Sequence, residues 1–387
     1  MISIEEALHR IYTQQVNPVA IEKPLLEAGG FYLAESIHAP FDLPDFDNSA
    51  MDGYAVCGLS DNYTIVGEVA AGDTLISKLN EGEAMRIFTG GKIPENTTAV
   101  VMQEKTEVDN DNLKITAEIK PGQHIRPKGG ELATGQLVFD SAHLISPASV
   151  GLIRSLGIEF VKVFQKPVVG LIVTGNELID PGQHRMPGQI YESNSISITA
   201  ALEKFGYSCA EKLKVEDDYE KTRDAIGDFL DKTDLLLLSG GISVGDYDYV
   251  KKALLENGVE EIFYKVFQKP GKPLFFGKKG SKYVFALPGN PASSLTCFYI
   301  YLLPMLQKMS GAFEYGLPQM PLPLAHNYQM SGDRPAFLKA KIAGQKVTIL
   351  DGQGSSMLHT MALGNALVFL QPGSDLKSGD MVQCFFI

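Results

Sequence analysis

The sequence predicts a multidomain protein of the α/β plus β class, built around a doubly wound α/β domain. Three observations lead to this prediction. The chain of 387 residues is long enough for about two to three domains. Strand-like and helix-like patterns alternate over residues 166–310. Residues 41–140 and 316–387 instead hold short β-type runs separated by Gly, Asn, Asp and Pro.

The first part of the chain, up to about residue 40, is predicted to be helical. Ser3 and Glu6 have the spacing of a capping box before a first helix, and a second helix is predicted over residues 21–34. The β-type runs of the next zone are 63–66, 84–88, 99–104, 113–119 and 136–139. A helical pattern returns over 146–156, where Pro147 suits the first turn after a Ser cap.

The α/β zone begins with an apolar run over residues 168–174, which is typical of a parallel strand buried on both faces. Helical patterns follow at 195–205, 219–232, 249–257 and 292–309. Further strand patterns lie at 209–215, 234–239, 262–267, 274–277 and 283–287. This alternation predicts a doubly wound sheet, and the turn-rich final zone predicts a small β-barrel or sandwich.

Composition restricts the partners and the compartment. The 46 acidic and 34 basic side chains give a net charge of −12, which disfavours nucleic acid and membrane surfaces as partners. The four cysteines are scattered singly without a C-x-x-C pair, so neither a zinc site nor a redox pair is predicted. The sequence shows no secretion signal and no apolar run that could span a bilayer, so we expect a cytoplasmic protein with reduced thiols.

Loops that follow four strands are expected to meet at one edge of the sheet, where open α/β sheets bind their ligands. These loops are 174–177, 239–248, 269–273 and 288–294. Gly240, Gly241 and Gly289 lack a Cβ, so backbone N–H groups there can approach a phosphate closely. Positive charge is predicted to come from a single loop, which holds Lys265, Lys269 and Lys272. The edge is therefore predicted to bind an anion.

Acidic side chains near these loops suggest a Mg²⁺ site, because Mg²⁺ binds through one or two carboxylates together with substrate phosphates. The candidates are Glu177, Asp217, Asp218, Asp246 and Asp248, but the pair Asp217–Asp218 can also be explained as the start of a helix. Residues 241–245 match G-x-S-x-G, which leaves a serine hydrolase that uses Ser243 as an alternative. Its histidine would have to come from the separate C-terminal zone, as His326 or His359.

Five segments together resemble the MoeA family of molybdopterin molybdenumtransferases, which is related to the gephyrin E domain. They are Asp47–Ala55, Thr89–Gly90, Ser239–Gly245, Lys269–Pro273 and Leu287–Pro291. The resemblance covers essentially the whole chain and implies four domains. These are a helical linking and dimerisation domain (1–40 and 141–165), a β-rich inserted domain (41–140), an α/β molybdopterin-binding domain (166–311) and a C-terminal β-barrel (312–387).

The resemblance also implies the last step of molybdenum cofactor assembly. Adenylylated molybdopterin, delivered by a molybdopterin adenylyltransferase, would bind as substrate. Its phosphoanhydride would be hydrolysed with Mg²⁺, AMP would leave, and molybdenum from molybdate would be inserted at the dithiolene. The protein would be a homodimer, with its active cleft between the α/β domain of one subunit and the β-rich inserted domain of the other.

Residue roles follow from the resemblance by matched position. It implies catalytic roles for Asp52, Thr89, Glu177, Asp248, Lys265 and Lys269. Substrate binding is implied for Arg126, Glu131, Asp217, Ser239, Gly240, Gly241, Pro288, Gly289, Asn290 and Pro291. Molybdate binding is implied for Ser243, Lys272, Ser293, Arg334 and Ser355, and metal binding for Glu177, Asp217 and Asp248.

Two residues depart from the family's pattern. Glu131 stands where Asp is usual, and Asn176 stands where Asp is common, which removes one charge beside Glu177. A non-catalytic, gephyrin-like binding scaffold is the alternative function from another class. The enzyme is favoured by intact site residues of several kinds, namely Asp52, Glu177, Asp248, Lys272 and Ser355.

Overall fold

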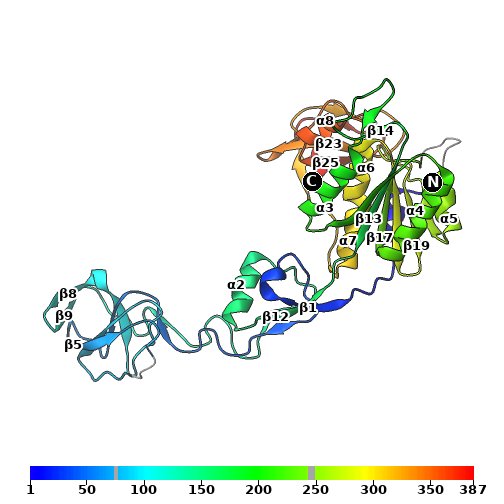
Figure 1. Ribbon diagram of the computed structural model, residues 1–387. Coiled ribbons are helices and arrows are strands. Elements are labelled where there is room, and N and C mark those ends of the chain that lie inside the picture. Colours follow the sequence, from blue (N-terminus) through cyan, green and yellow to red (C-terminus); the bar gives the residue numbers. More distant parts are fainter. Residues whose placement is uncertain (74–76, 243–248) are drawn as a thin grey trace. The chain divides into compact units, whose positions relative to one another are not determined.

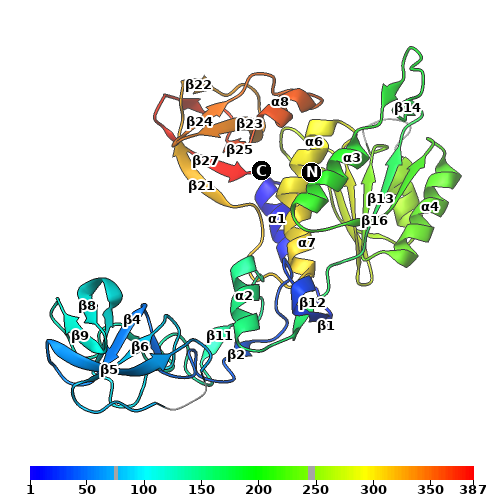
Figure 2. The ribbon, with the colours of Figure 1, turned by 60° about the vertical axis from the view of Figure 1, so that its left-hand side comes forward.

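The computed structural model describes residues 1–73, 77–242 and 249–387, which form two compact units (Figure 1 and Figure 2). The first unit holds Met1–Glu22, Gly30–Ala34 and Lys162–Ile387, and the second holds Lys23–Gly29 and Glu35–Val161. The first unit contains an α/β body and a C-terminal barrel, whereas the second is mostly β.

A six-stranded sheet forms the α/β body, in the order β16-β13-β17-β20-β19-β18. Its strands are β13 (Val169–Thr174), β16 (Cys209–Val215), β17 (Leu235–Ser239), β18 (Glu260–Tyr264), β19 (Phe275–Lys279) and β20 (Lys282–Leu287). The strands β13, β16, β17 and β20 are parallel, whereas β19 is antiparallel to both of its neighbours. Strand β18 therefore runs with β20, and the carboxyl ends of all these strands except β19 meet at one edge, as the sequence predicts.

Helices cover both faces of this sheet, which confirms the doubly wound arrangement (Figure 1). They are α1 (Ile4–Tyr12), α3 (Asn194–Lys204), α4 (Tyr219–Lys232), α5 (Tyr249–Glu256) and a continuous run of α6 (Pro291–Cys297), a π-helical turn (Phe298–Leu302) and α7 (Leu303–Met309). Leu236 and Leu238 of β17 pack into the core beneath α4 and α5. Leu235 and Leu237 pack into the core beneath α1, α3 and α7 instead, because successive side chains of a strand point to opposite faces.

A small β-barrel follows the α/β body, as the sequence predicts. Its five-stranded sheet has the order β21-β27-β25-β23-β24. The strands are β21 (Gln319–Pro323), β23 (Ala336–Ala343), β24 (Lys346–Ile349), β25 (Ala366–Leu370) and β27 (Met381–Phe386). A bridge between Leu324 and Val347 joins the two edges and closes the barrel. Shorter elements of the first unit are β14 (Leu178–Ile179), β15 (Ile190–Tyr191), β22 (Tyr328–Gln329), β26 (Asp375–Leu376) and α8 (Leu358–Leu363).

The second unit is built on another six-stranded sheet, in the order β7-β4-β6-β5-β9-β8. Its strands are β4 (Gly53–Val56), β5 (Asn62–Val69), β6 (Glu83–Ile87), β7 (Ala99–Met102), β8 (Thr106–Asp109) and β9 (Asn112–Ile115). Short pairs are made by β2 (Ile37–His38) with β11 (Leu137–Phe139) and by β3 (Asn48–Ser49) with β10 (Ile125–Arg126). The helix α2 (Pro147–Ser155) begins with a capping box between Ser146 and Ser149, which confirms the predicted Ser cap.

The predicted helix over residues 21–34 is wrong. That segment forms strand β1 (Ala20–Pro24) and a 3₁₀ turn (Leu25–Glu27), and β1 pairs with β12 (Phe160–Phe164). Pro24 has no N–H to donate within a helix, and Gly30 adopts a φ of +76°, which ends any regular helix there. At Ser3 the N-cap forms, with the Ser3 hydroxyl accepting from Glu6 N at 3.1 Å, but the Glu6 carboxylate pairs with Arg10 at 2.7 Å instead of closing the box.

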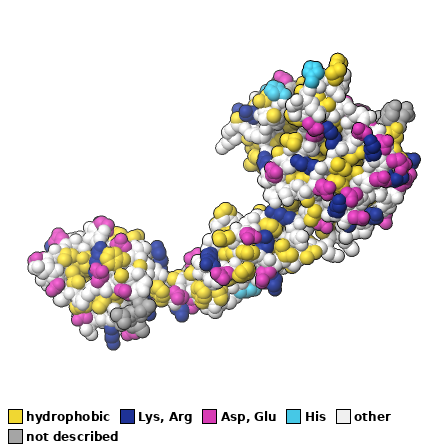
Figure 3. Space-filling view, viewed as in Figure 1, with side chains coloured by type: hydrophobic (Ala, Val, Ile, Leu, Met, Phe, Trp, Pro, Cys, Tyr) yellow, Lys and Arg dark blue, Asp and Glu magenta, His cyan; other side chains and the backbone are white. Residues whose placement is uncertain are grey.

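The surface carries mixed charge. On the face of the first unit that Figure 3 shows, acidic and basic side chains are interspersed. On α4, for example, Arg223 pairs with Glu220 at 2.6 Å and Lys232 pairs with Asp228 at 2.7 Å. Within the described residues, every helix is too short or too polar to pass through a lipid bilayer.

Candidate functional site

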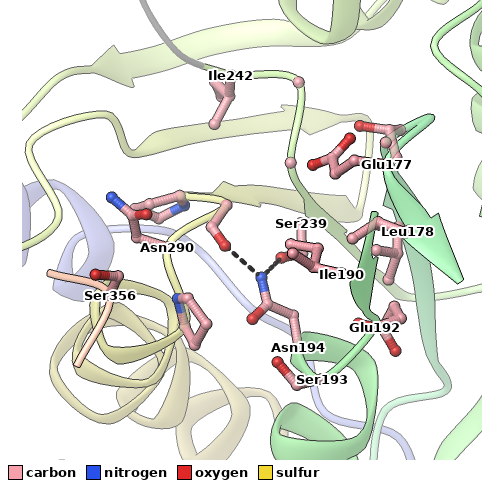
Figure 4. A pocket seen from close by; sticks show the side chains of 18 of the residues that line it. Glu177, Leu178, Ile190, Glu192, Ser193, Asn194, Ser239, Ile242, Asn290 and Ser356 are labelled. Carbon is pink, nitrogen blue, oxygen red and sulfur yellow. Dashed lines mark hydrogen bonds between the residues drawn. The ribbon is translucent and has the colours of Figure 1, made fainter. Parts of the chain in front are cut away.

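A cavity of about 670 Å³ lies at the carboxyl edge of the α/β sheet (Figure 4). Its walls come from the loops after β13, β16, β17 and β20, together with the start of α3. The predicted site residues that line it are Glu177, Asp217, Ser239, Gly240, Gly241, Pro288, Gly289, Asn290 and Pro291. Strand order therefore brings together residues that lie more than one hundred positions apart in the sequence.

Two glycines let the loop after β17 lie directly on the end of β13. Gly240 adopts a φ of +98°, and a Cβ there would lie 2.4 Å from the Thr174 carbonyl oxygen. Gly241 adopts a φ of +63°, and its Cβ would lie 2.7 Å from Val250 Cγ2. Any other residue at either position would strain the backbone and force the loop away from Thr174 or Val250. The bare backbone therefore forms one wall of the cavity.

Asn194, which the sequence reasoning missed, ties two walls together. Its Nδ2 donates to Ser239 Oγ and to the Gly289 carbonyl oxygen, both at 2.8 Å (Figure 4). The residue is only 8% exposed, so these bonds are shielded from water. Its position at the start of the helix that follows the first loop is the signal that sequence reasoning could have used.

The acidic residues of the cavity have different tasks. Asp217 Oδ2 accepts from Asn176 N at 3.2 Å, and Asn176 Oδ1 accepts from Asp217 N at 2.9 Å. The departure at Asn176 thus keeps an acceptor that fixes Asp217 beside Glu177. Asp218 caps α4 by accepting from Lys221 N at 2.8 Å, so capping accounts for Asp218 and not for Asp217.

Glu192 also lines the cavity, but its carboxylate accepts from Ser195 N at 2.7 Å at the start of α3. The described residues contain no group of three or more His, Cys, Asp or Glu that could hold a metal ion. Glu177 and Asp217 are the two predicted metal-binding carboxylates that line the cavity. The predicted site residues Ser243 and Asp248 lie outside the described residues.

The basic loop, residues 265–273, lies next to this cavity, because its last residue, Pro273, lines the cavity wall. Lys265 N donates to the Leu274 carbonyl oxygen at 2.9 Å, and its φ of +67° ends β18 before the predicted boundary at residue 267. Gln268, which is 0% exposed, donates from Nε2 to the Gly271 carbonyl oxygen at 3.1 Å and accepts from the Tyr301 hydroxyl. The loop is thus held from within by buried polar bonds.

The barrel contributes to the same region of the first unit. Arg334 donates from Nη1 to the Gln268 carbonyl oxygen at 3.0 Å, which joins the barrel to the basic loop. Ser293 N donates to the Ser355 carbonyl oxygen at 3.2 Å, and Asn290 Nδ2 donates to Ser355 Oγ at 3.0 Å. The structure therefore gathers the predicted residues Ser293, Arg334 and Ser355 around the basic loop and the start of α6.

The remaining predicted residues lie in the second unit. Asp52 precedes β4 and Thr89 follows the antiparallel neighbour β6, so both lie at the same end of that sheet. Asp52 Oδ1 accepts from Thr89 N at 2.7 Å and from Thr89 Oγ1 at 2.8 Å. These hydrogen bonds hold the pKa of the Asp52 carboxyl below its usual value. Arg126 lies on β10, and Glu131 follows in a loop whose backbone bonds to Leu43.

Comparisons with known proteins agree along the whole chain. Residues 2–157 match the family described as the MoeA N-terminal region (domain I and II). Residues 170–308 match a probable molybdopterin binding domain, and residues 321–386 match the MoeA C-terminal region (domain IV).

Individual relatives carry the same name. A molybdopterin molybdenumtransferase of Haemophilus influenzae is 36% identical over 325 residues, covering 82% of this chain and 80% of that protein. One from Staphylococcus aureus is 30% identical over 395 residues, covering 98% and 94%. The crystal structure of the molybdopterin biosynthesis moeA protein from Pyrococcus horikoshii OT3 has a TM-score of 0.85 at 27% identity and covers 100% of both chains. The chain therefore belongs to the MoeA family of molybdopterin molybdenumtransferases, which are enzymes of molybdenum cofactor biosynthesis.

Proposed function

We propose that the protein inserts molybdenum from molybdate into adenylylated molybdopterin, with Mg²⁺-dependent hydrolysis of the phosphoanhydride and release of AMP, to give molybdenum cofactor. The observation that carries this proposal is the composition of the edge of the α/β sheet. Carboxylates of Glu177 and Asp217 line one part of its cavity. The basic loop and the Ser293–Ser355 contact lie beside another part, so groups for a cation and for anions stand within one site.

The adenylylated substrate carries two linked phosphates, which suit the walls of this cavity. The backbone at Gly240, Gly241 and Gly289 has no side chain to keep a phosphate away. Ser239 and Asn194 hold these loops together, so they need little rearrangement when the substrate binds. Pro288, Asn290 and Pro291 complete the wall on the α6 side.

The donor set fits a magnesium ion. Mg²⁺ takes one or two protein carboxylates with substrate phosphates and water, and Glu177 and Asp217 supply that number. Asp248 is proposed as a further ligand. When bound, the ion would neutralise charge on the phosphoanhydride during hydrolysis, which depends on positioning and charge more than on a covalent nucleophile.

Molybdate is a tetrahedral dianion, and ammonium, guanidinium and hydroxyl groups are its natural donors. Lys272, Ser293, Arg334 and Ser355 supply these groups, and Ser243 is proposed with them. Lys265 and Lys269, on the same loop, are proposed to stabilise the charge that develops as AMP leaves.

The remaining catalytic groups are proposed to come from a second subunit. In a homodimer, Asp52, Thr89, Arg126 and Glu131 of one chain would face the α/β domain of its partner. The ionised Asp52 carboxylate, held by Thr89, would then act on the substrate. A cytoplasmic molybdopterin adenylyltransferase is proposed as the donor of the adenylylated substrate.

Lys272→Ala tests the proposal. Loss of a charged hydrogen bond costs about 1.5–3 kcal/mol, so the KM for molybdate should rise roughly 10-fold or more while the KM for adenylylated molybdopterin stays the same. Lys279→Ala is the matched control. Lys279 lies opposite Lys282 in the β19–β20 ladder, at the end of the strands away from the candidate site. An equal rise in the KM for molybdate and in the KM for adenylylated molybdopterin in Lys272→Ala would contradict the proposed role of the basic loop.

A further inference from the structure

A buried lysine of the barrel has no part in the reaction described above. Lys339 lies on β23 and is only 2% exposed, whereas Lys341 on the same strand is exposed. The Lys339 ammonium donates to the carbonyl oxygens of Gly354 and Met357, at 2.9 and 3.3 Å. Its acceptors are thus backbone carbonyls of one loop rather than carboxylates.

Burying the Lys339 ammonium is unfavourable unless other interactions compensate for the lost hydration. Removing a charge from water costs several kcal/mol even in a real protein, and two carbonyl bonds offset only part of this cost. Burial accordingly lowers the pKa of Lys339. An apolar side chain of similar length would fill the same space without this penalty, but it would leave the Gly354 and Met357 carbonyl oxygens without their donor. The charge therefore serves the loop that carries these carbonyl groups rather than the apolar core of the barrel.

The loop held by Lys339, residues 350–357, is clamped to β23 by a second residue as well. Gln353 Oε1 accepts from Lys339 N at 2.9 Å, and Gln353 Nε2 donates to the Lys339 carbonyl oxygen at 2.9 Å. The loop is fixed on its barrel side by one charged and one neutral side chain.

The other side of this loop contacts the site. Ser355 directly follows Gly354, the first acceptor of the Lys339 ammonium. Ser355 accepts from Ser293 N through its carbonyl oxygen and from Asn290 Nδ2 through its hydroxyl. The next residue, Ser356, lines the cavity (Figure 4). A short chain of contacts thus runs from the buried ammonium to the start of α6.

We propose that Lys339 is a positioning residue that fixes Ser355 for binding the oxyanion substrate. The inference rests on the proposed function, in which Ser355 binds molybdate. The ammonium acts in two ways. It holds the Gly354 carbonyl in place, and by bonding to that carbonyl it polarises the peptide unit that Gly354 shares with the Ser355 N–H, which becomes a stronger donor to an anion.

Lys339→Met tests the inference, with Lys341→Met as the matched control on the same strand. Met removes the cost of burying a charge but leaves the Gly354 and Met357 carbonyl oxygens without the ammonium donor, so the two effects oppose each other and we expect only a small change in melting temperature. We also expect the KM for molybdate to rise roughly 10- to 100-fold, as for other small misplacements of a binding group, with an unchanged KM for adenylylated molybdopterin. Lys339→Arg, which keeps a charged donor, should restore most of the affinity.

A double-mutant cycle separates positioning from a general structural role. If Lys339 acts through Ser355, Lys339→Met should add little to the molybdate defect of Ser355→Ala. Multiplicative effects of the two substitutions, or equal changes in both KM values, would overturn the inference. If Lys339→Met does not fold, Lys339→Gln, which keeps two donors without the charge, takes its place with the same expected pattern.

Hydrogen exchange keeps this test apart from that of the proposed function. Lys339→Met should speed exchange in peptides covering 350–357 and leave the rest of the barrel unchanged, whatever the substrate is. Unchanged exchange in that loop would overturn the inference by itself. Absence of molybdate-dependent turnover in the unmodified protein would instead refute the proposed function.

Discussion

Gly271→Ala probes how tightly the basic loop is seated on the α/β body. Gly271 adopts a φ of +85°, and a left-handed conformation costs a residue with a Cβ about 1–2 kcal/mol. The new Cβ would also lie 2.5 Å from Cys297 Sγ, far inside the usual contact distance of about 3.5–4.0 Å. Overpacking of this kind costs about 1–3 kcal/mol. Together the two effects should destabilise the α/β body by about 2–5 kcal/mol.

A Cys297→Ala background isolates the packing part. Without the sulfur, the 2.5 Å contact disappears, whereas the backbone strain and a 3.0 Å approach of the new Cβ to Gln268 Nε2 remain. Gly271→Ala should then cost less than in the native background, by up to about 1–3 kcal/mol. Urea-dependent hydrogen exchange of the buried β17 amides assigns the free energy of unfolding to the α/β body. If Gly271→Ala lowers the free energy of unfolding by the same amount in both backgrounds, the close contact between Gly271 and Cys297 is refuted, and with it the described packing of the basic loop.

Other predictions concern Asp52, Asn194 and the thiols. Thr89→Val should raise the pKa of Asp52, because it removes a hydroxyl that donates to the carboxylate. The pKa of Asp52 is lowered in the folded protein, so its ionised form stabilises the fold above the unfolded-state pKa. This stabilisation is lost as the pH falls through the folded-state pKa. A carboxyl NMR titration without any rise would contradict this bond. Asn194→Asp should weaken AMP binding at least roughly 10-fold, because a carboxylate would face the Gly289 carbonyl oxygen in place of a donor. Unchanged AMP binding, measured by calorimetry, would contradict the role of Asn194 in holding the two loops together. In the native protein, Cys297 and Cys384 should resist a thiol reagent until unfolding, because both are 0% exposed and burial raises their pKa, to about 11 for Cys384. Rapid reaction of all four thiols would contradict the described cores.

Much of the fold could be predicted because local pattern and tertiary structure agree. The helix over residues 219–232 has an apolar stripe, an Asp cap and no internal Pro, and α4 has those bounds. The apolar run at 168–174 predicts β13 because only a strand covered on both faces hides six consecutive apolar or small residues. In both segments the local signal is strong enough to set the bounds.

Other elements depend on partners far away in the sequence. The two-residue strands β3 and β10 form through long-range pairing, with each other and, for β3, with residues 90–92, and no local pattern marks them. The segment 21–34 has helical apolar spacing, but Pro24 and the pairing of β1 with β12 override it. Such outcomes are decided by tertiary contacts that the sequence does not display.

The same distinction applies to the site. The loops after β17 and β20 were predictable, because the edge of an α/β sheet is fixed by strand order. The tasks of Asn194 and Lys339 were not, because each depends on side-chain contacts between distant segments. The assignment of Asp217 to the cavity and Asp218 to the helix cap likewise needed the structure, since the two residues are neighbours of the same type.

The proposed function depends most directly on whether molybdate controls the release of AMP. Purified protein would be mixed with adenylylated molybdopterin and Mg²⁺, with and without molybdate, and AMP would be quantified together with reconstitution of an apo-molybdoenzyme. We predict AMP release that requires molybdate and parallels reconstitution. AMP release that is absent, or that does not depend on molybdate, would contradict the proposed reaction.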